Sequence, residues 1–148
     1  MPVNPSFVGR SYPPTPPYRV SREKIREFAD AINDPNPAYR SVEAAHALGH
    51  RDVVAPPTFP IVLTLPAGHQ FIADPESGVD YTRVVHGEQR FVHERPVTAG
   101  DELQVVLTID AIRVAAGNEL ITNRAEVRTT DGELVSTATS VIVVRGGQ

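Results

Sequence analysis

The second half of the chain alternates apolar and polar residues over four long segments, and this pattern constrains the fold more than any other feature. The four segments are residues 83–93, 101–114, 119–128 and 134–144. Alternation with a period of two is typical of strands that are buried on one face. The links between them are short, and Asp131-Gly132 is a two-residue hairpin signal. The sequence therefore predicts four strands in an antiparallel meander.

A continuous apolar segment, residues 55–66, precedes these strands. Proline is tolerated in a first helical turn, so Pro57 and Pro60 are compatible with a helix start, and Pro66 is expected to end or kink that helix. A helix that is apolar all round must be buried, and this one is the only adequate cover for the sheet. We therefore predict an α+β fold in which an antiparallel sheet wraps around a central apolar helix, the hot-dog architecture.

The N-terminal residues 1–18 are rich in proline and predict an extended arm. We expect the arm to lie across the surface of the domain; a ligand for an SH3-type module is the alternative. Ser21 is a suitable N-cap for the helix that follows. Its apolar residues recur at the spacing of one buried helical stripe: Ile25, Phe28, Ala29 and Ile32.

The stretch after this helix, residues 33–39 (NDPNPAY), carries the most chemistry. Its two prolines prevent the helix from continuing, so a rigid turn should present the Asp34 carboxylate, the Asn36 carboxamide and the Tyr39 phenol. Asp, Asn and Pro are also ordinary turn residues, and a simple helix stop remains the alternative. Ser41 is then expected to cap a short helix over residues 42–48 that ends at Gly49.

A metal site and several classes of partner are disfavoured. His46 and His50 are four residues apart, but Gly49 ends the helix between them and no third ligand is evident, so we expect no metal. The net charge is −4 without a basic run, which disfavours nucleic acid. No apolar run approaches the roughly 18 residues that a membrane span needs. The chain lacks cysteine, which excludes disulfides and a cysteine nucleophile. We expect one cytoplasmic domain spanning residues 1–148.

Three stretches together resemble the MaoC-like hot-dog dehydratases: residues 33–39 (NDPNPAY), 86–91 (HGEQRF) and 95–103 (RPVTAGDEL). The first resembles the hydratase signature of that family. More narrowly, the chain is similar to the A-type (HadA-like) subunit of the actinobacterial (3R)-hydroxyacyl-ACP dehydratase of type II fatty acid synthesis. The resemblance implies reversible addition of water across the double bond of an acyl-ACP or acyl-CoA thioester, without a cofactor.

Within this resemblance, Asp34 matches the catalytic Asp of the family and Asn36 matches the Asn that orders the loop. Tyr39 stands where the family has its catalytic His, and a phenol with a pKa near 10 is a poor base at neutral pH. Pro56-Pro57 stands where catalytic members carry a His-Gly step, although proline has no N–H to donate to an oxyanion. The site is therefore degenerate, and its activity alone is expected to be weak or absent.

Three functions follow from the resemblance. The first is a substrate-binding subunit whose catalytic dyad comes from a B-type hot-dog partner. The second is a self-sufficient hydratase homodimer that uses Asp34, with His86 or His93 as a candidate second group, although a separation of seven residues should put these two on opposite faces of a strand. The third is a non-catalytic module that binds acyl thioesters. The residues expected to bind substrate are Tyr39, Pro57, Thr58, Phe59 and Val62, with the N–H of Thr58 or Phe59 near the acyl carbonyl.

Four arginines are candidates for contact with phosphopantetheine or an acidic carrier protein: Arg10, Arg83, Arg90 and Arg95. Scattered arginines also occur on any solvated surface, which is the alternative interpretation.

Overall fold

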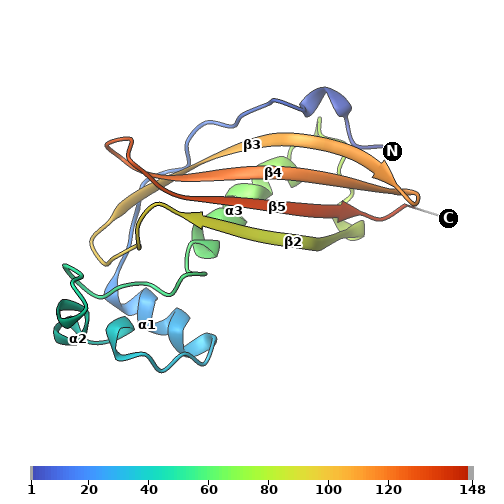
Figure 1. Ribbon diagram of the computed structural model, residues 1–148. Helices are drawn as coiled ribbons and strands as arrows, with labels where there is room; N and C mark the ends of the chain where they lie inside the picture. The colour runs from blue at the N-terminus through green and yellow to red at the C-terminus, as the bar shows by residue number, and fades with distance from the viewer. Residues whose placement is uncertain (1, 147–148) are drawn as a thin grey trace.

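The computed structural model describes residues 2–146 and contains a five-stranded antiparallel sheet with the order β1-β3-β4-β5-β2 (Figure 1). The strands are β1 (Tyr18–Arg19), β2 (Val84–His93), β3 (Glu102–Ala115), β4 (Asn118–Thr129) and β5 (Leu134–Val144). The helices are α1 (Arg22–Ala31), α2 (Val42–Ala47) and α3 (Ile61–Ile72), and short 3-10 helices occupy Pro5–Phe7, Pro37–Tyr39 and Tyr81–Arg83.

The sheet curls over α3, as the sequence predicts. Every second residue is buried over residues 103–109 of β3 and 121–127 of β4, and these residues form the inner face of the sheet: Leu103, Val105, Leu107, Ile109, Ile121, Asn123, Ala125 and Val127. α3 packs against β3 and β4, and Figure 1 shows it lying behind the strands on one face of the sheet. The alternating pattern therefore reports the side of each strand that meets the helix.

The strand order differs from the predicted meander. β3, β4 and β5 follow one another through hairpins, but β2 pairs with β5 rather than with β3. The link between β2 and β3 hydrogen-bonds instead to the segment that precedes α3. Ala55 N donates to Val97 O at 2.8 Å, and Ala99 N donates to Val53 O at 2.9 Å. Because of these bonds the link does not form a hairpin between β2 and β3. β2 instead lies at the edge of the sheet beside β5.

The central helix begins and ends later than predicted. Residues 56–60 form tight turns in which Phe59 N donates to Pro56 O, and α3 starts only at Ile61. Pro66 does not end the helix, which continues to Ile72. α3 is buried on one side only, because Leu65 is 42% exposed. None of the helices within residues 2–146 is long and apolar enough to span a membrane.

The proline-rich arm lies along β3, as expected (Figure 1). Tyr12 N donates to Leu107 O at 2.8 Å and Thr15 N donates to Val105 O at 3.0 Å. β1, at the end of the arm, then pairs with the first residues of β3. The arm thus covers an edge of the sheet that would otherwise leave backbone groups unpaired.

Helix α1 confirms its predicted cap, since Ser21 Oγ accepts a hydrogen bond from Lys24 N at 3.1 Å. Ile25 and Ala29 are buried and Phe28 packs against the core. Ile32 departs from the predicted buried stripe, because it lies at the C-cap and is 44% exposed.

Candidate functional site

The turn that follows α1 is fixed by its own side chains. Asn33 adopts a left-handed conformation with a φ of 57°, and the chain then reverses. The Asp34 carboxylate accepts a hydrogen bond from Asn36 N at 3.1 Å, and the Asn36 side-chain oxygen accepts one from Ala38 N at 3.0 Å. Asn36 therefore caps the 3-10 helix Pro37–Tyr39. In this structure both polar side chains hold the turn.

Tyr39 ends this turn and is only 9% exposed. Burial raises the pKa of its phenol, the neighbouring Asp34 carboxylate raises that pKa further, and a hydrogen bond with Asn36 opposes these two effects. The phenol is therefore neutral near pH 7, where it is able to donate or accept a hydrogen bond but is a very weak base.

A cavity of about 410 Å³, here called the outer cavity, opens beside this turn. Most of its lining comes from three segments: Asn36, Ala38 and Tyr39 of the turn, residues 54–57 before α3, and residues 93–97 at the end of β2. Asn36, Tyr39 and Pro57 thus meet in one place. His50 and His93 also line the cavity. Sequence reasoning considered His50 only as a metal ligand and did not place it here.

Four other candidate residues do not line the outer cavity: Asp34, Thr58, Phe59 and Val62. Phe59 is fully buried and meets Phe28 edge to face, with ring centroids 5.5 Å apart. Its N–H donates to Pro56 O, whereas no group within residues 2–146 accepts a hydrogen bond from Thr58 N. Of the two backbone donors considered for an acyl carbonyl, the one on Thr58 remains available. Val62 lies under the proline-rich arm.

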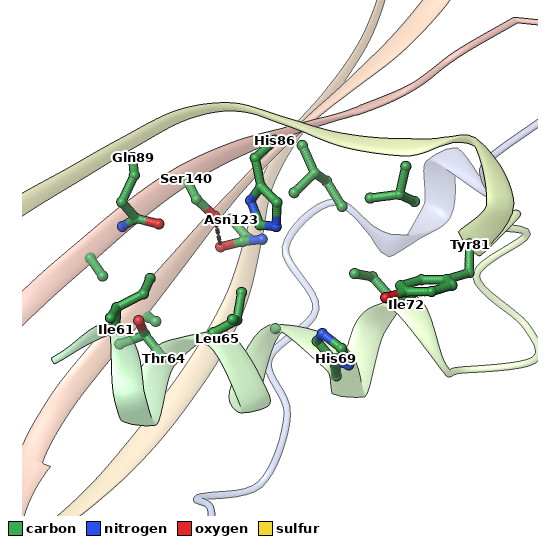
Figure 2. A pocket seen from close by; sticks show the side chains of 15 residues that line it. Ile61, Thr64, Leu65, His69, Ile72, Tyr81, His86, Gln89, Asn123 and Ser140 are labelled. Carbon is green, nitrogen blue, oxygen red and sulfur yellow. Dashed lines mark hydrogen bonds between the residues drawn. The ribbon is translucent and has the colours of Figure 1, made fainter. Parts of the chain in front are cut away.

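A second cavity of about 210 Å³, here called the inner cavity, lies between α3 and strands β2, β4 and β5 (Figure 2). The polar side chains that line it come from all four elements: Thr64, His69, His86, Gln89, Asn123 and Ser140, with Tyr81 from the segment before β2. In the sequence, Asn123 alternates with Ile121, Ala125 and Val127, at a position expected to be apolar, but it was not considered as a site residue. An amide at a core position is the sequence signal that could have identified this cavity.

A bulge in β2 corrects the prediction for its two histidines. The register shifts between His86 and Glu88, so that His86 pairs with Ile142 while His93 pairs with Ser136. Those partners are six residues apart along β5 and share one face, and the extra residue at the bulge cancels the odd spacing. His86 and His93 therefore both lie on the side that faces α3, not on opposite faces. The prediction was wrong because the sequence alone did not reveal the bulge.

The four candidate arginines pair with different carboxylates. Arg10 meets Asp74 at 3.9 Å, Arg83 meets Asp80 at 3.3 Å, and Arg90 meets Glu88 at 2.9 Å. Arg95 contacts the buried Asp101 at 3.0 Å as well as Glu133, and the hydrogen bond to Asp101 is the main cause of its raised pKa. Arg51 also donates to Asp101. The Arg95–Asp101 pair therefore stiffens the wall of the outer cavity.

The two histidines considered as metal ligands, His46 and His50, make different contacts. His46 shares a hydrogen bond of 3.0 Å with Arg51 O through its Nε2, whereas His50 follows Gly49, whose φ is 89°, and lines the outer cavity. Among residues 2–146, no group of three or more His, Asp or Glu side chains is arranged to hold a metal ion.

Comparison with known proteins decides the family. The family model described as FAS1-like, dehydratase domain region, matches residues 6–138. The chain belongs to this family. A UPF0336 protein of Streptomyces coelicolor is 55% identical to it over 148 residues, which cover 100% of this chain and 99% of that protein. This relative therefore matches the chain along its whole length.

Solved structures connect the FAS1-like dehydratase domain to the hot-dog dehydratases. The C-terminally truncated HadBC (3R-hydroxyacyl-ACP dehydratase) complex from Mycobacterium tuberculosis matches with a TM-score of 0.83 and 34% identity, over 93% of this chain and 96% of the matched chain. A MaoC-like dehydratase matches with a TM-score of 0.88 and 34% identity, over 96% of this chain but 43% of its own length. The predicted hot-dog fold and the MaoC-like resemblance are confirmed.

Proposed function

We propose that this protein is the substrate-holding subunit of a heterodimeric (3R)-hydroxyacyl thioester dehydratase in type II fatty acid synthesis. Its substrate is an acyl-ACP or acyl-CoA thioester, and a B-type hot-dog subunit supplies the catalytic Asp and His. The observation that carries this proposal is the buried, neutral phenol of Tyr39 at the position where the family has its histidine.

Hydration of an enoyl thioester needs a group that exchanges a proton at neutral pH and a donor for the developing oxyanion. Burial and the nearby Asp34 both move the Tyr39 pKa upward, away from neutrality. Pro56 and Pro57 offer no N–H where they line the outer cavity. The proton-exchanging group is therefore poorly provided, and the backbone donor that remains, Thr58 N, does not line the outer cavity, whereas the apolar walls needed to hold an acyl chain are present.

The two cavities support the substrate-holding role because both lie on the side of β2 that faces α3. His93 lines the outer cavity and Gln89 lines the inner cavity, and both point from β2 toward α3. A thioester head in the outer cavity would thus direct its acyl chain along α3 toward the inner cavity.

The free surface of the chain supports a hot-dog partner. β2 is the last strand of the sheet, no described strand pairs with its outer edge, and most of its residues are exposed. Val85 is 40% exposed and Val92 is 54% exposed. Such an edge presents backbone N–H and C=O groups with which a strand of a partner subunit can pair. The matched HadBC structure is itself a complex of two different subunits.

The test is hydration of crotonyl-CoA, followed by loss of enoyl absorbance, with this chain alone, with a B-type hot-dog subunit alone, and with their mixture. We expect the mixture to exceed either protein alone by at least about 100-fold, as expected when general acid–base groups are supplied. Full activity of this chain alone would contradict the proposal.

A self-sufficient homodimeric hydratase is the second candidate, and one observation favours it. His93 lines the outer cavity with Tyr39, and its Nδ1 lies 3.0 Å from Ser136 Oγ, which donates a hydrogen bond to Val92 O at 3.3 Å. This arrangement leaves Nε2 available for proton transfer. If the homodimer is active and His93→Gln lowers its kcat about 100-fold, this second function replaces the first.

A further inference from the structure

The inner cavity contains a carboxamide that is only partly hydrogen-bonded. Asn123 is 6% exposed and lies on the otherwise apolar inner face of β4. Ser140 Oγ donates to its Oδ1 at 2.7 Å, as Figure 2 shows. Its Nδ2 makes no hydrogen bond with any residue from 2 to 146, and Asn123 lines the inner cavity. The Ser140 contact therefore orients the amide so that its N–H groups face the cavity.

Thr64 presents a second unpartnered group on the opposite wall. Its side chain is 7% exposed and rises from α3 toward the strands (Figure 2). Its Oγ1 is the only buried side-chain N or O atom of the described residues that lacks a hydrogen-bond partner. A buried hydroxyl without a partner destabilises a protein, so such groups usually have a ligand or a structural water.

Donors thus approach the cavity from both walls, and the bulge at Gly87 brings Gln89 and His86 to the same space. An unsubstituted alkyl chain entering this cavity would remove water from the Asn123 amide without replacing its hydrogen bonds, and it would leave the Thr64 hydroxyl without a partner. An oxygen atom on the chain would accept hydrogen bonds from both. The lining therefore favours a polar ligand over a hydrocarbon of the same length.

We propose that the inner cavity is a specificity site for an oxygen-bearing acyl chain, with a hydroxyl or keto group remote from the thioester. This inference rests on the proposed substrate-holding function. Gln89 is four residues from His93 along β2, which is about 13 Å at the rise of a strand. The oxygen is thus recognised well beyond the reacting carbons, by Asn123 and Thr64.

The test is calorimetric binding of matched pairs of acyl-CoA thioesters to the purified full chain. The pairs are the octanoyl, decanoyl and dodecanoyl thioesters and their ω-hydroxy counterparts. We expect the hydroxylated member of at least one pair to bind about tenfold more tightly or better, consistent with hydrogen bonds that an alkyl chain leaves unmade.

Two variants locate the preference. Thr64→Val and Asn123→Leu should each reduce the preference about tenfold and tighten binding of the plain acyl thioester, because the alkyl chain no longer leaves a polar group without a hydrogen bond. Thr122→Val, on the opposite face of β4, is the matched control and should keep the preference. Melting curves establish that each variant is folded.

The outcomes separate this inference from the function on which it rests. Equal binding of every pair, tighter binding of the plain members, or a preference that survives Thr64→Val and Asn123→Leu would overturn the specificity site and leave the substrate-holding function standing. Failure of the chain to bind any acyl thioester, alone or with its B-type partner, would overturn both.

Discussion

The outer and inner cavities differ in how their polar groups are used. Around the outer cavity, the Asn36 side chain is hydrogen-bonded within its own turn, and Arg95 is bonded to Asp101 and Glu133. Around the inner cavity, Thr64 Oγ1 and Asn123 Nδ2 have no partner within the described part of the chain. Asn36 and Arg95 thus build the wall of the outer cavity, whereas Thr64 Oγ1 and Asn123 Nδ2 remain available for a ligand in the inner cavity.

The largest expected effect concerns a wall of the outer cavity. Asp101 is 4% exposed and accepts hydrogen bonds from Arg51, Arg95 and Thr98 N. Asp101→Ala removes a buried charge from its partners, so urea unfolding should show a loss of about 3 kcal/mol. Glu102→Ala, at an exposed ion pair with Arg19, is the control and should cost less than about 1 kcal/mol. Equal effects would mean that the buried network does not hold this wall.

The inner cavity should respond in the opposite direction. Thr64→Val keeps the shape of the side chain and removes an unpartnered buried hydroxyl, so the free energy of unfolding should rise by about 1–2 kcal/mol. Thr122→Val on the other face of β4 should change it by less than about 0.5 kcal/mol. A clear loss of stability in Thr64→Val would show that the hydroxyl already has a partner in solution.

The turn beside the outer cavity should lose stability when its cap is removed. Asn36 Oδ1 accepts a hydrogen bond from Ala38 N at 3.0 Å, and Asn36→Ala removes this acceptor. We expect urea unfolding to show a loss of about 1 kcal/mol, with most of it recovered in Asn36→Asp. If both variants unfolded with the same free energy as the wild type, the Asn36 side chain would not stabilise the turn and would be free for another role.

The smallest effect is a dependence on pH. Because burial and Asp34 raise the pKa of Tyr39 in the folded state, the folded phenol keeps its proton at a pH where the unfolded one loses it. Stability is thus unaffected below about pH 10, and it falls as the pH rises from there through the folded pKa. The fall in Tm should be smaller in Tyr39→Phe than in the wild type. An identical fall in Tm for both proteins would show that the pKa of Tyr39 is not raised in the folded state.

Features set by neighbouring residues were predictable from the sequence. Ser21 caps α1 through its own first turn, the prolines define the turn at residues 33–39, and alternation marks the inner faces of β3 and β4. Each depends on residues a few positions apart. The same is true of the turn that contributes Asn36 and Tyr39 to the outer cavity.

Features set by distant segments were not predictable in this way. β2 lies beside β5 because the link after it bonds to residues 53–55, and the bulge at Gly87 moves His86 to the inner face. The start of α3 also differs from the prediction, although here the cause is local, since turns within residues 56–60 replace the first helical turn. The inner cavity depends on the pairing of β2 with β5, on the bulge and on the position of α3. The amide of Asn123 at a core position is the one signal for this cavity in the sequence.

The central claim is that this chain holds the substrate while its partner performs the chemistry. It is tested most directly by crotonyl-CoA hydration in the mixed heterodimer, with Asp34→Asn in this chain compared with the matching Asp→Asn change in the B-type subunit. The account predicts a rate within about twofold of the wild-type pair for Asp34→Asn and a loss of at least about 100-fold for the change in the partner. A loss of that size from Asp34→Asn would contradict it.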